Sequence, residues 1–403
     1  MVNIAILGFG TVGSGVAEVL TKNSGLIDGR VNNQVRLKYI MRARDIFEGP
    51  YKDLFVKDFS TIEHDPEVGI VVETIGGVGA ALDYTTRALK AGKSVVTANK
   101  ELVATHGYEL LQLAKEHGVS YLFEASVGGG IPILRPLNAC LAANEVDQVT
   151  GILNGTTNYI LTRMIKAGLT FEQALKEAQD KGYAEKDPTA DVEGHDACRK
   201  ICILASIAFG RHVYPRQVPT EGITGVTLAD VAYAESCNRK IKLLGRAVKE
   251  LDGKICAYVA PHLIDAEAPL AGVEDVFNAI MVKGDAIGDV MFYGRGAGKL
   301  PTASAVVADV MDAARHIRSR KRVEWGPGGE DVTVSPEGVP FRWYVRCAGT
   351  AEKVRAAGLD AALLSRPGAP ADEVAFLTRA MPRGELMSAL SGMELGSLFR
   401  VLE

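Results

Sequence analysis

The sequence lacks any pairing pattern among its cysteines. Its 403 residues include 6 cysteines, none of them in a CxxC pair. Cys198 and Cys202 lie four residues apart, but no histidine or further cysteine completes a zinc pattern around them. We therefore expect small buried thiols in a reduced cytoplasmic protein, without a disulfide framework or a structural zinc site.

Long hydrophobic runs and a strong net charge are also missing. The longest apolar run, around residues 201–209, is too short to cross a bilayer, and the N-terminus lacks the features of a signal peptide. A formal net charge of −4 gives no reason to expect nucleic acid or a membrane surface as a partner. With 47% apolar and 23% charged residues, the composition is typical of a soluble protein of two or three domains.

A glycine-rich turn follows the first predicted strand, residues 2–7. Gly8, Gly10 and Gly13 form a GxGxxG motif that leads directly into a predicted helix. In this motif the first glycine permits a tight turn, the second lets a pyrophosphate approach, and the third allows close helix packing. A turn in another kind of α/β unit is the alternative, but this position favours dinucleotide binding.

The second predicted strand, residues 35–41, ends in basic residues. An NAD-specific fold usually has an acidic residue here for the ribose 2′-hydroxyl, whereas this chain has Arg42 and Arg44. Their charge favours the 2′-phosphate of NADP, although an arginine at a strand end is often simply exposed. Lys57, near the next turn, is a further candidate for the same phosphate or a solvated lysine.

Strands and helices alternate at short spacing as far as residue 124. This pattern predicts a doubly wound parallel sheet that binds its ligand at the carboxyl ends of the strands. Asn99 and Lys100 follow such an end, where starting a helix is their alternative role. The predicted strands cover 68–75, 94–97 and 120–124, and the predicted helices cover 82–91 and 108–116.

A loop with three glycines runs from Glu124 to Ile131. Its carbonyl oxygens and one carboxylate form a hard-oxygen environment that suits an alkali cation. A plain tight loop is the alternative, and we expect a helix over 133–143 to follow it.

The composition changes after residue 144. A strand over 149–153 leads into a polar turn, which includes Gly155 and Thr156 and opens a helix over 159–167. Small polar groups at such a junction suit a small polar ligand, and an ordinary helix cap is the alternative. An amphipathic helix over 169–181 follows.

The stretch from 182 to 210 combines an acidic loop with a very apolar helix. The loop carries Glu185 and Asp191, and the helix places Asp196 and Lys200 on one face at i and i+4. A solvated ion pair is the ordinary alternative for such a spacing. Because the helix continues into an apolar run, we expect a buried pair that holds a zwitterion and moves a proton.

The last part of the chain is less distinctive. A glycine-rich loop at 294–302 precedes a predicted helix, and it either closes over a cofactor or simply connects two elements. Residues 325–329 are typical of a domain boundary, and a small α/β module is expected after them. The other elements expected here are a helix over 226–236, strands over 241–249, 254–262 and 276–282, and a helix over 303–317.

Taken in order, these segments resemble the homoserine dehydrogenase family over roughly residues 2–320. The resemblance rests on GFGTVG, ETIGG, ANK, EASVGGGIPIL, GILNGTTNYIL, GYAEKDP, GHDACRK and GRGAGKLPTASAV. It implies the NAD(P)-dependent reduction of L-aspartate 4-semialdehyde to L-homoserine, in the synthesis of threonine, methionine and isoleucine. It also implies a Rossmann-type domain over 1–134, on which helix 301–317 packs, and an α+β catalytic and dimerisation domain over 135–320.

The resemblance assigns roles to individual positions. Lys200 is similar to the proton donor, Asp196 to its partner near the substrate, and Lys100 to a lysine between cofactor and substrate. The substrate-binding positions are Glu185, Asp191, Asp196, Gly155 and Thr156. The cofactor positions are Gly8, Gly10, Thr11, Val12, Gly13, Arg42, Lys57, Thr74, Asn99, Lys100, Gly182 and Gly298. Glu124, Val127, Gly129 and Ile131 resemble the family's sodium site.

Residues 327–403 resemble a shortened ACT domain, the βαββαβ module that senses amino acids in many relatives. The expected strand over 341–346 runs into a short helix over 351–357, so we expect weak or no response to threonine. A homo-oligomer, dimer or tetramer, is expected. Two other functions stay open: a different amino-acid or semialdehyde oxidoreductase, and an inactive NADP-binding regulator, which should have lost Lys200 or Asp196.

Overall fold

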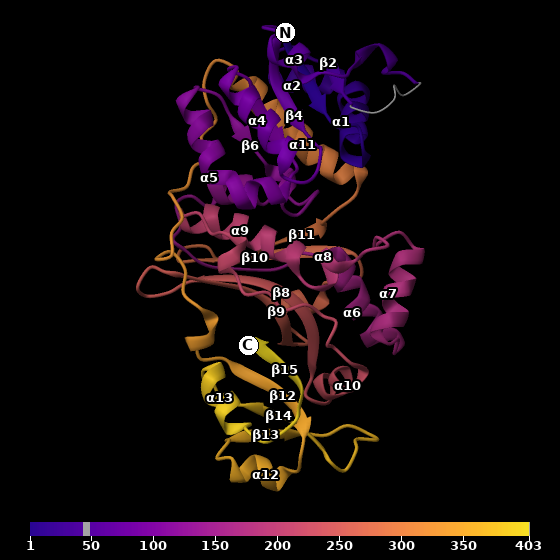
Figure 1. Cartoon of the computed structure of the whole chain (residues 1–403), viewed down its shortest axis with the longest axis vertical. Coiled ribbons are helices and arrows are strands. Elements are labelled where there is room, and N and C mark those ends of the chain that lie inside the picture. The colour runs from indigo at the N-terminus through magenta and orange to yellow at the C-terminus, as the bar shows by residue number, and fades with distance from the viewer. Residues whose placement is uncertain (43–48, 403) are drawn as a thin grey trace.

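A computed structural model describes residues 1–42 and 49–402 of the chain. Figure 1 shows three parts stacked along the long axis, with the N-terminal part at one end and residues after about 340 at the other. Arg44, a candidate for the 2′-phosphate, lies outside the described residues. Within the described ranges, none of the helices combines the length and apolar character that crossing a membrane requires.

The N-terminal part is built on a six-stranded parallel sheet in the order β3-β2-β1-β4-β5-β6. This order confirms the predicted doubly wound fold, because strands are added on both sides of β1. The strands are β1 (Val2–Leu7), β2 (Val35–Met41), β3 (Phe55–Val56), β4 (Val68–Glu73), β5 (Ser94–Thr97) and β6 (Tyr121–Leu122).

Helices cover both faces of this sheet. Ile4 and Ile6 of β1 pack with α1 (Thr11–Lys22), α2 (Ser24–Val31) and the late helix α11 (Lys299–Arg315). Ala5 and Leu7 point to the opposite face, which is covered by α3 (Phe59–Glu63), α4 (Gly79–Lys90) and α5 (Lys100–Glu116). Both faces of β1 are thus buried, as expected for a parallel strand in such a sheet.

Helix α11 returns from the central part of the chain to pack against α1. The close approach needs Gly15, since a Cβ there would lie 2.9 Å from the Lys299 carbonyl oxygen. The first residue of α11 is therefore held at the glycine-rich turn that begins α1.

The remaining strands form one continuous nine-stranded sheet in the order β11-β10-β7-β8-β9-β15-β12-β14-β13. Its central part contains β7 (Val146–Ile152), β8 (Arg239–Lys249), β9 (Ile255–Asp265), β10 (Phe277–Gly284) and β11 (Gly288–Arg295). The helices of this part are α6 (Gly155–Ala167), α7 (Phe171–Asp180), α8 (Thr189–Val192), α9 (His195–Phe209) and α10 (Leu228–Ser236). Ile201 of α9 reaches the sheet at Gly245 of β8, where a Cβ would lie 3.2 Å from the Ile201 Cβ.

The C-terminal part has the element order βαββαβ. It consists of β12 (Arg342–Ala348), α12 (Ala351–Ala356), β13 (Ala361–Leu364), β14 (Glu373–Thr378), α13 (Arg383–Ala389) and β15 (Leu395–Leu402). Strand β15 pairs in parallel with β9, with Arg400 opposite His262. The module is therefore joined to the central sheet by backbone hydrogen bonds.

Several expected elements differ from the structure. The helix expected over 133–143 is shorter and takes a π-helical form at Pro136–Cys140, where the Leu141 N–H donates to the Pro136 carbonyl at 2.8 Å. The Glu124 carboxylate accepts the N–H groups of residues 133–135 at its start. Helix α5 begins at Lys100 rather than 108 and has non-helical angles at His106. Strand β11 occupies the start of the expected loop at 294–302, and β13 is the second strand that the expected βαββαβ order requires.

The segment 325–329 is anchored rather than loose. Trp325 is buried against Phe123 and His212, and its indole N–H donates to His212 Nδ1 at 3.0 Å. A short parallel bridge joins Arg211 to Gly326. The chain is thus held to the central part just before it enters the C-terminal module.

Candidate active site

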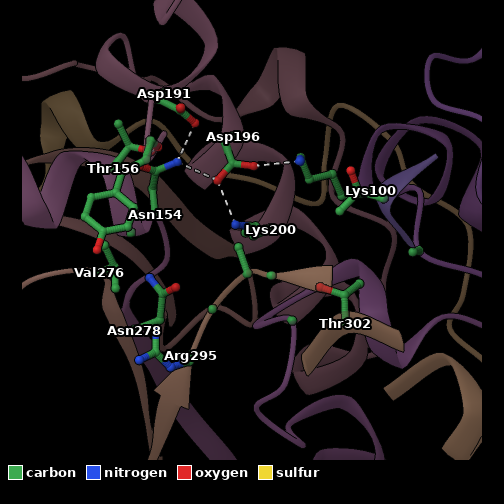
Figure 2. Close-up of a pocket in the computed structure, with 18 of the residues that line it drawn as sticks. Lys100, Asn154, Thr156, Asp191, Asp196, Lys200, Val276, Asn278, Arg295 and Thr302 are labelled. Carbon is green, nitrogen blue, oxygen red and sulfur yellow. Dashed lines mark hydrogen bonds and ion pairs between the residues drawn. The ribbon is translucent and has the colours of Figure 1, made fainter. Parts of the chain in front are cut away.

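A cavity of about 650 Å³ lies where the carboxyl ends of the parallel strands meet the central part of the chain. The end of β5, the starts of α1, α5 and α6, the loop before α8, and α9 all contribute lining residues. Figure 2 shows how these side chains converge. Of the predicted residues, the cavity brings together Thr11, Val12, Lys100, Gly129, Gly155, Thr156, Gly182, Glu185, Asp191, Asp196, Lys200 and Gly298.

Asp196 and Lys200 form a buried ion pair on α9. The Lys200 ammonium donates to Asp196 Oδ2 at 2.7 Å and to the Leu153 carbonyl oxygen at 2.7 Å. The two residues are only 5% and 8% exposed, respectively. The ordinary alternative of a solvated pair is therefore wrong for this helix.

A second ammonium reaches the same carboxylate from the parallel sheet. Lys100 Nζ lies 2.9 Å from Asp196 Oδ1, and Figure 2 shows the two lysines approaching Asp196 from different directions. Lys100 can do so because it is the first residue of α5, whose N-cap is Asn99. The carboxylate of Asp196 thus contacts one lysine of its own helix, α9, and one lysine that follows strand β5 of the parallel sheet.

The charges at this point shift the pKa values of both partners. Burial alone would raise the pKa of Asp196, but Lys200 and Lys100 outweigh it and hold the pKa well below its usual range. The Asp196 carboxylate in turn raises the pKa of Lys100, against the effect of burial. Asp196 consequently stays ionised at neutral pH.

Asn154 connects the cluster to the acidic loop. Its Nδ2 donates to Asp191 Oδ1 at 2.7 Å and to Asp196 Oδ2 at 2.9 Å, while its Oδ1 caps α6 by accepting the Thr157 N–H. Burial, together with the charge of Asp196, raises the pKa of Asp191. The sequence placed Asn154 in a polar turn, but no local signal indicated that it would bridge two carboxylates.

The polar turn at α6 faces the same space. Gly155 is required by a close approach, since a Cβ there would lie 2.8 Å from the Val276 carbonyl oxygen. The Thr156 hydroxyl donates to the Tyr183 carbonyl at 2.7 Å and so holds the loop that carries Glu185. Gly182, at φ +72°, lets this loop turn back from α7.

The glycine-rich turn has the geometry that a dinucleotide requires. A Cβ at Gly13 would lie 2.1 Å from the Gly8 carbonyl oxygen, and one at Gly8 would meet the Thr74 carbonyl at 2.8 Å. Gly10, in contrast, has no atom within 4 Å of its added Cβ, which leaves room for a phosphate. Thr74 supports this turn, because its hydroxyl donates to the Leu7 and Gly8 carbonyls at 3.0 and 3.1 Å.

Two other cofactor candidates lie together at the edge of the parallel sheet. Met41 pairs with Val56, so Arg42 and Lys57 follow neighbouring strand ends, and the Arg42 N–H donates to the Val56 carbonyl at 3.1 Å. Neither residue lines the 650 Å³ cavity. This arrangement places two basic residues at the end of β2, the usual location of the ribose-recognition residue.

Asn99 and Thr74 line a second, smaller cavity of about 260 Å³ beside the first. Val12, Ala98 and Lys100 line both cavities, which makes them adjoining. Asn99 caps α5 through its Oδ1 and donates to the Gly77 carbonyl at 2.6 Å. The alternative role that we gave for Asn99, starting a helix, is thus the one that its side chain performs.

The Glu124 carboxylate belongs to the fold rather than to a cation site. It accepts N–H bonds from Ile133 and Leu134 at 2.7 and 2.9 Å, and from Arg135 at 2.7 Å. Within the described ranges, no group of three histidine, cysteine, aspartate or glutamate side chains is arranged to hold a metal. A cation in this loop would therefore be held by backbone carbonyl oxygens.

Sequence reasoning missed several further side chains of the large cavity, among them Asn278, Arg295 and Thr302. Asn278 is buried on β10 and donates to the Ile152 carbonyl at 2.8 Å. It fits against Gly296 so closely that an added Cβ would lie 1.2 Å from Asn278 Oδ1. Arg295 and Thr302 belong to the 294–302 segment, but the pairing of β11 places Arg295 at the cavity and the first turn of α11 places Thr302 there.

The arrangement suits a reaction on a small polar molecule beside a dinucleotide. Ammonium groups next to a site that holds a carbonyl can stabilise developing negative charge on oxygen and then supply a proton. The carboxylates can hold a cationic group of the same molecule.

Comparison with known families agrees with this reading. Residues 132–311 match the family described as homoserine dehydrogenase, and residues 8–124 match the one described as its NAD-binding domain. The homoserine dehydrogenase of Bacillus subtilis is 42% identical over 322 residues, which cover 79% of this chain and 74% of that protein. That of Corynebacterium glutamicum is 46% identical over 323 residues, covering 78% and 72%.

Solved structures show the same similarity. A homoserine dehydrogenase from Thiobacillus denitrificans superposes with a TM-score of 0.88 at 33% identity, covering 100% of this chain and 98% of that one. A hyperthermophilic archaeal homoserine dehydrogenase in complex with NADPH has a TM-score of 0.66 at 29% identity, covering 77% and 97%.

Proposed function

Because the chain belongs to the homoserine dehydrogenase family, we propose that the cavity around Asp196 is where L-aspartate 4-semialdehyde and L-homoserine are interconverted. The family activity is an NAD(P)-dependent oxidation and reduction in amino-acid biosynthesis. In the reducing direction, a hydride adds to the aldehyde carbon and a proton adds to its oxygen. The bound dinucleotide supplies the hydride, and the residues of this chain supply orientation, charge and the proton.

Lys200 is the proposed proton donor. An ammonium has three N–H donors, and two of those on Lys200 are used by Asp196 and the Leu153 carbonyl. The third has no acceptor among the described residues and is directed to the aldehyde oxygen, where negative charge develops during hydride transfer. Asp196 keeps the ammonium in position, and Lys100 adds a second positive charge on the side of the cofactor.

Glu185 and Asp191 are the proposed partners of the substrate ammonium. Both carboxylates line the cavity, and neither has a lysine or arginine within ion-pair distance in the described part of the chain. Gly155 and Thr156 would contact the amino acid through the start of α6. This leaves the aldehyde end directed toward Lys200.

NADP rather than NAD is the proposed preferred cofactor. Gly8, Gly10, Thr11, Val12 and Gly13 would hold its pyrophosphate at the start of α1. Arg42 and Lys57 end neighbouring strands and would bind the 2′-phosphate, which NAD lacks. The rest of the bound dinucleotide would contact Thr74, Asn99, Gly182 and Gly298.

A sodium ion and a homo-oligomer are further parts of the proposal. The carbonyl oxygens of Glu124, Val127, Gly129 and Ile131 supply hard ligands for an alkali ion in the loop beside the cavity. We expect a dimer or tetramer in the cytoplasm, with all six cysteines as free thiols. Light scattering measures the oligomer size, and the activity in NaCl against KCl measures the dependence on sodium.

The Lys200–Asp196–Lys100 cluster, in which Asp196 and Lys200 are buried, is the observation that carries this proposal. Purified protein should reduce NADP with L-homoserine and oxidise NADPH with aspartate 4-semialdehyde. Other hydroxy and amino acids serve as comparison substrates. Stronger activity with one of them would favour a different oxidoreductase, and NADP binding without turnover would favour the inactive regulator.

A further inference from the structure

The charged residues around the cavity are not equally paired. Its carboxylates are Glu185, Asp191 and Asp196, and its cations are Lys100, Lys200 and Arg295. Both lysines bind Asp196, at 2.9 and 2.7 Å. Within residues 1–42 and 49–402, no carboxylate lies within ion-pair distance of Arg295, so its guanidinium is available to an anion that enters the cavity.

The backbone and stem of Arg295 are nevertheless held in place. It is the last residue of β11 and pairs with Phe277 across the strand. Its guanidinium carbon lies 5.3 Å from the centre of the Phe277 ring, and Tyr293 stacks on the same ring at 5.2 Å. The Arg295 carbonyl accepts the Gly130 N–H at 3.1 Å. This support orients the side chain while leaving its N–H groups unused by any acidic side chain.

Arg295 belongs to the substrate side of the cavity. In the view of Figure 2 it lies next to Asn278, on the same side as Val276 and Thr156, while Lys100 and Thr302 lie on the other side. Thr302 is in the first turn of α11, the helix that packs at the glycine-rich turn. The cofactor is expected there, so Arg295 lies away from the dinucleotide.

We propose that Arg295 binds the carboxylate of the amino-acid substrate and so determines specificity for an α-amino acid. This inference rests on the proposed function, in which Glu185 and Asp191 hold the ammonium and Lys200 protonates the aldehyde oxygen. The three polar groups of the substrate would then each have a separate partner. A guanidinium suits this task because its planar fork matches both oxygens of a carboxylate.

Steady-state kinetics of Arg295→Gln test the proposal. Loss of a charge-assisted bond made equally in the bound substrate and the transition state should raise the KM for L-homoserine by about 10- to 100-fold. The kcat should stay within about threefold, and the KM for NADP should not change. Arg295→Lys keeps the charge but not the fork, so its KM for L-homoserine should lie between those of the unaltered chain and Arg295→Gln. Arg295 is exposed, so both variants should fold.

Two controls separate this role from others. Lys283→Gln removes an exposed positive charge from β10, at the other end of the same hairpin, and should leave every constant unchanged. Inhibition by L-2-aminobutyrate, which retains the carboxylate, should weaken in Arg295→Gln, whereas inhibition by propylamine, which lacks it, should not.

The outcomes are distinguishable. A raised KM for NADP with an unchanged KM for L-homoserine would overturn the proposal and place Arg295 on the dinucleotide. Unchanged constants for both, or equal weakening of the two inhibitors, would overturn it as well. If the unaltered chain does not oxidise L-homoserine, the proposed function itself fails and takes this inference with it.

Discussion

At the scale of single residues, Asp196 determines the charge state of the site. One carboxylate contacts two ammonium groups, so the cluster carries a net positive charge close to the expected position of the aldehyde oxygen. Breaking such a buried pair leaves an uncompensated charge and typically costs about 3–5 kcal/mol. Asp196 variants are therefore expected to lose stability as well as activity, because both lysines lose their partner. Lys200 is the cleaner residue to test, since Asp196 keeps its contact with Lys100 when Lys200 is replaced.

Replacing Lys200 with methionine should lower kcat by roughly 100-fold or more, the usual scale for a lost general acid. The affinity for NADP, measured by fluorescence titration, should change little because the side chain faces the substrate. Lys176→Met on the exposed face of α7 is a matched control, since among the described residues Lys176 makes an ion pair with Asp180 alone. Near-normal turnover in Lys200→Met would make Lys100 the stronger candidate.

At the scale of elements, we expect the ends of β2 and β3 to decide which dinucleotide is bound. Their in-register pairing places Arg42 beside Lys57, although 15 residues separate them in the sequence. A 2′-phosphate would contact both strand ends, whereas a ribose hydroxyl would not attract them.

Arg42→Asp should weaken NADP far more than NAD, because it removes a charge-assisted partner and adds a repulsive one. Dissociation constants for both cofactors measure this directly, separately from turnover. Arg42→Gln distinguishes the lost attraction from the added repulsion and should have an intermediate effect. Equal losses for both dinucleotides would mean that Arg42 supports the fold only.

At the scale of the whole molecule, the C-terminal module is an extension of the central sheet. Strand β15 covers the edge of β9, and the buried Arg400 contacts Glu221 at 2.9 Å and stacks on Tyr258, Phe341 and Trp343. Asp230 of α10 also accepts from Arg346 at 2.8 Å and from Tyr344 at 2.9 Å. The module thus contributes to the core, yet the last residue that lines the large cavity is Thr302.

Deleting residues 327–403 should preserve basal turnover but lower the thermal midpoint or change the oligomer size, because the edge of β9 and its apolar face become exposed. Differential scanning fluorimetry and light scattering measure both effects. We also expect threonine to inhibit weakly or not at all. Saturable calorimetric binding, with inhibition that the deletion abolishes, would instead establish a regulatory module.

The pairing of β15 with β9 places His262 at the junction of the two parts. We expect the free energy of unfolding to fall in acid because of this residue. Burial, aided by the charge of Arg400, lowers the pKa of His262 to about 3. The unfolded chain binds a proton near pH 6.5 and the folded chain does not, so stability from this group is complete above pH 6.5. It is lost as the pH falls toward 3, by up to about 1.4 kcal/mol per pH unit.

Urea unfolding between pH 7 and pH 4.5 measures this loss, and His262→Gln should show a smaller pH dependence than the unaltered chain. Exposed His117 provides the control, since His117→Gln should leave the slope unchanged. A slope that is the same in all three proteins would assign the acid sensitivity to other groups.

The sequence by itself determined the doubly wound fold and the dinucleotide turn, because these depend on local patterns such as apolar runs of strand length and glycines at fixed offsets. Its i,i+4 pair entering an apolar helix was also a local pattern, whereas the resemblance to homoserine dehydrogenases supplied most of the other predicted residues that line the cavity. The acidic loop, the α6 turn and Lys100 were each recognisable from their own few residues.

Only the tertiary structure decided what these residues contact. Asp196 meets Lys100 across the two parts of the chain, Asn154 bridges two carboxylates, and Arg295 faces the cavity because β11 pairs with β10. The sequence predicted a domain boundary at residues 325–329, but the pairing of β15 with β9 joins the parts on either side of it in one continuous sheet. Such contacts join residues far apart in the chain, and side-chain pairing across strands and helices depends on register and packing, which no local pattern records.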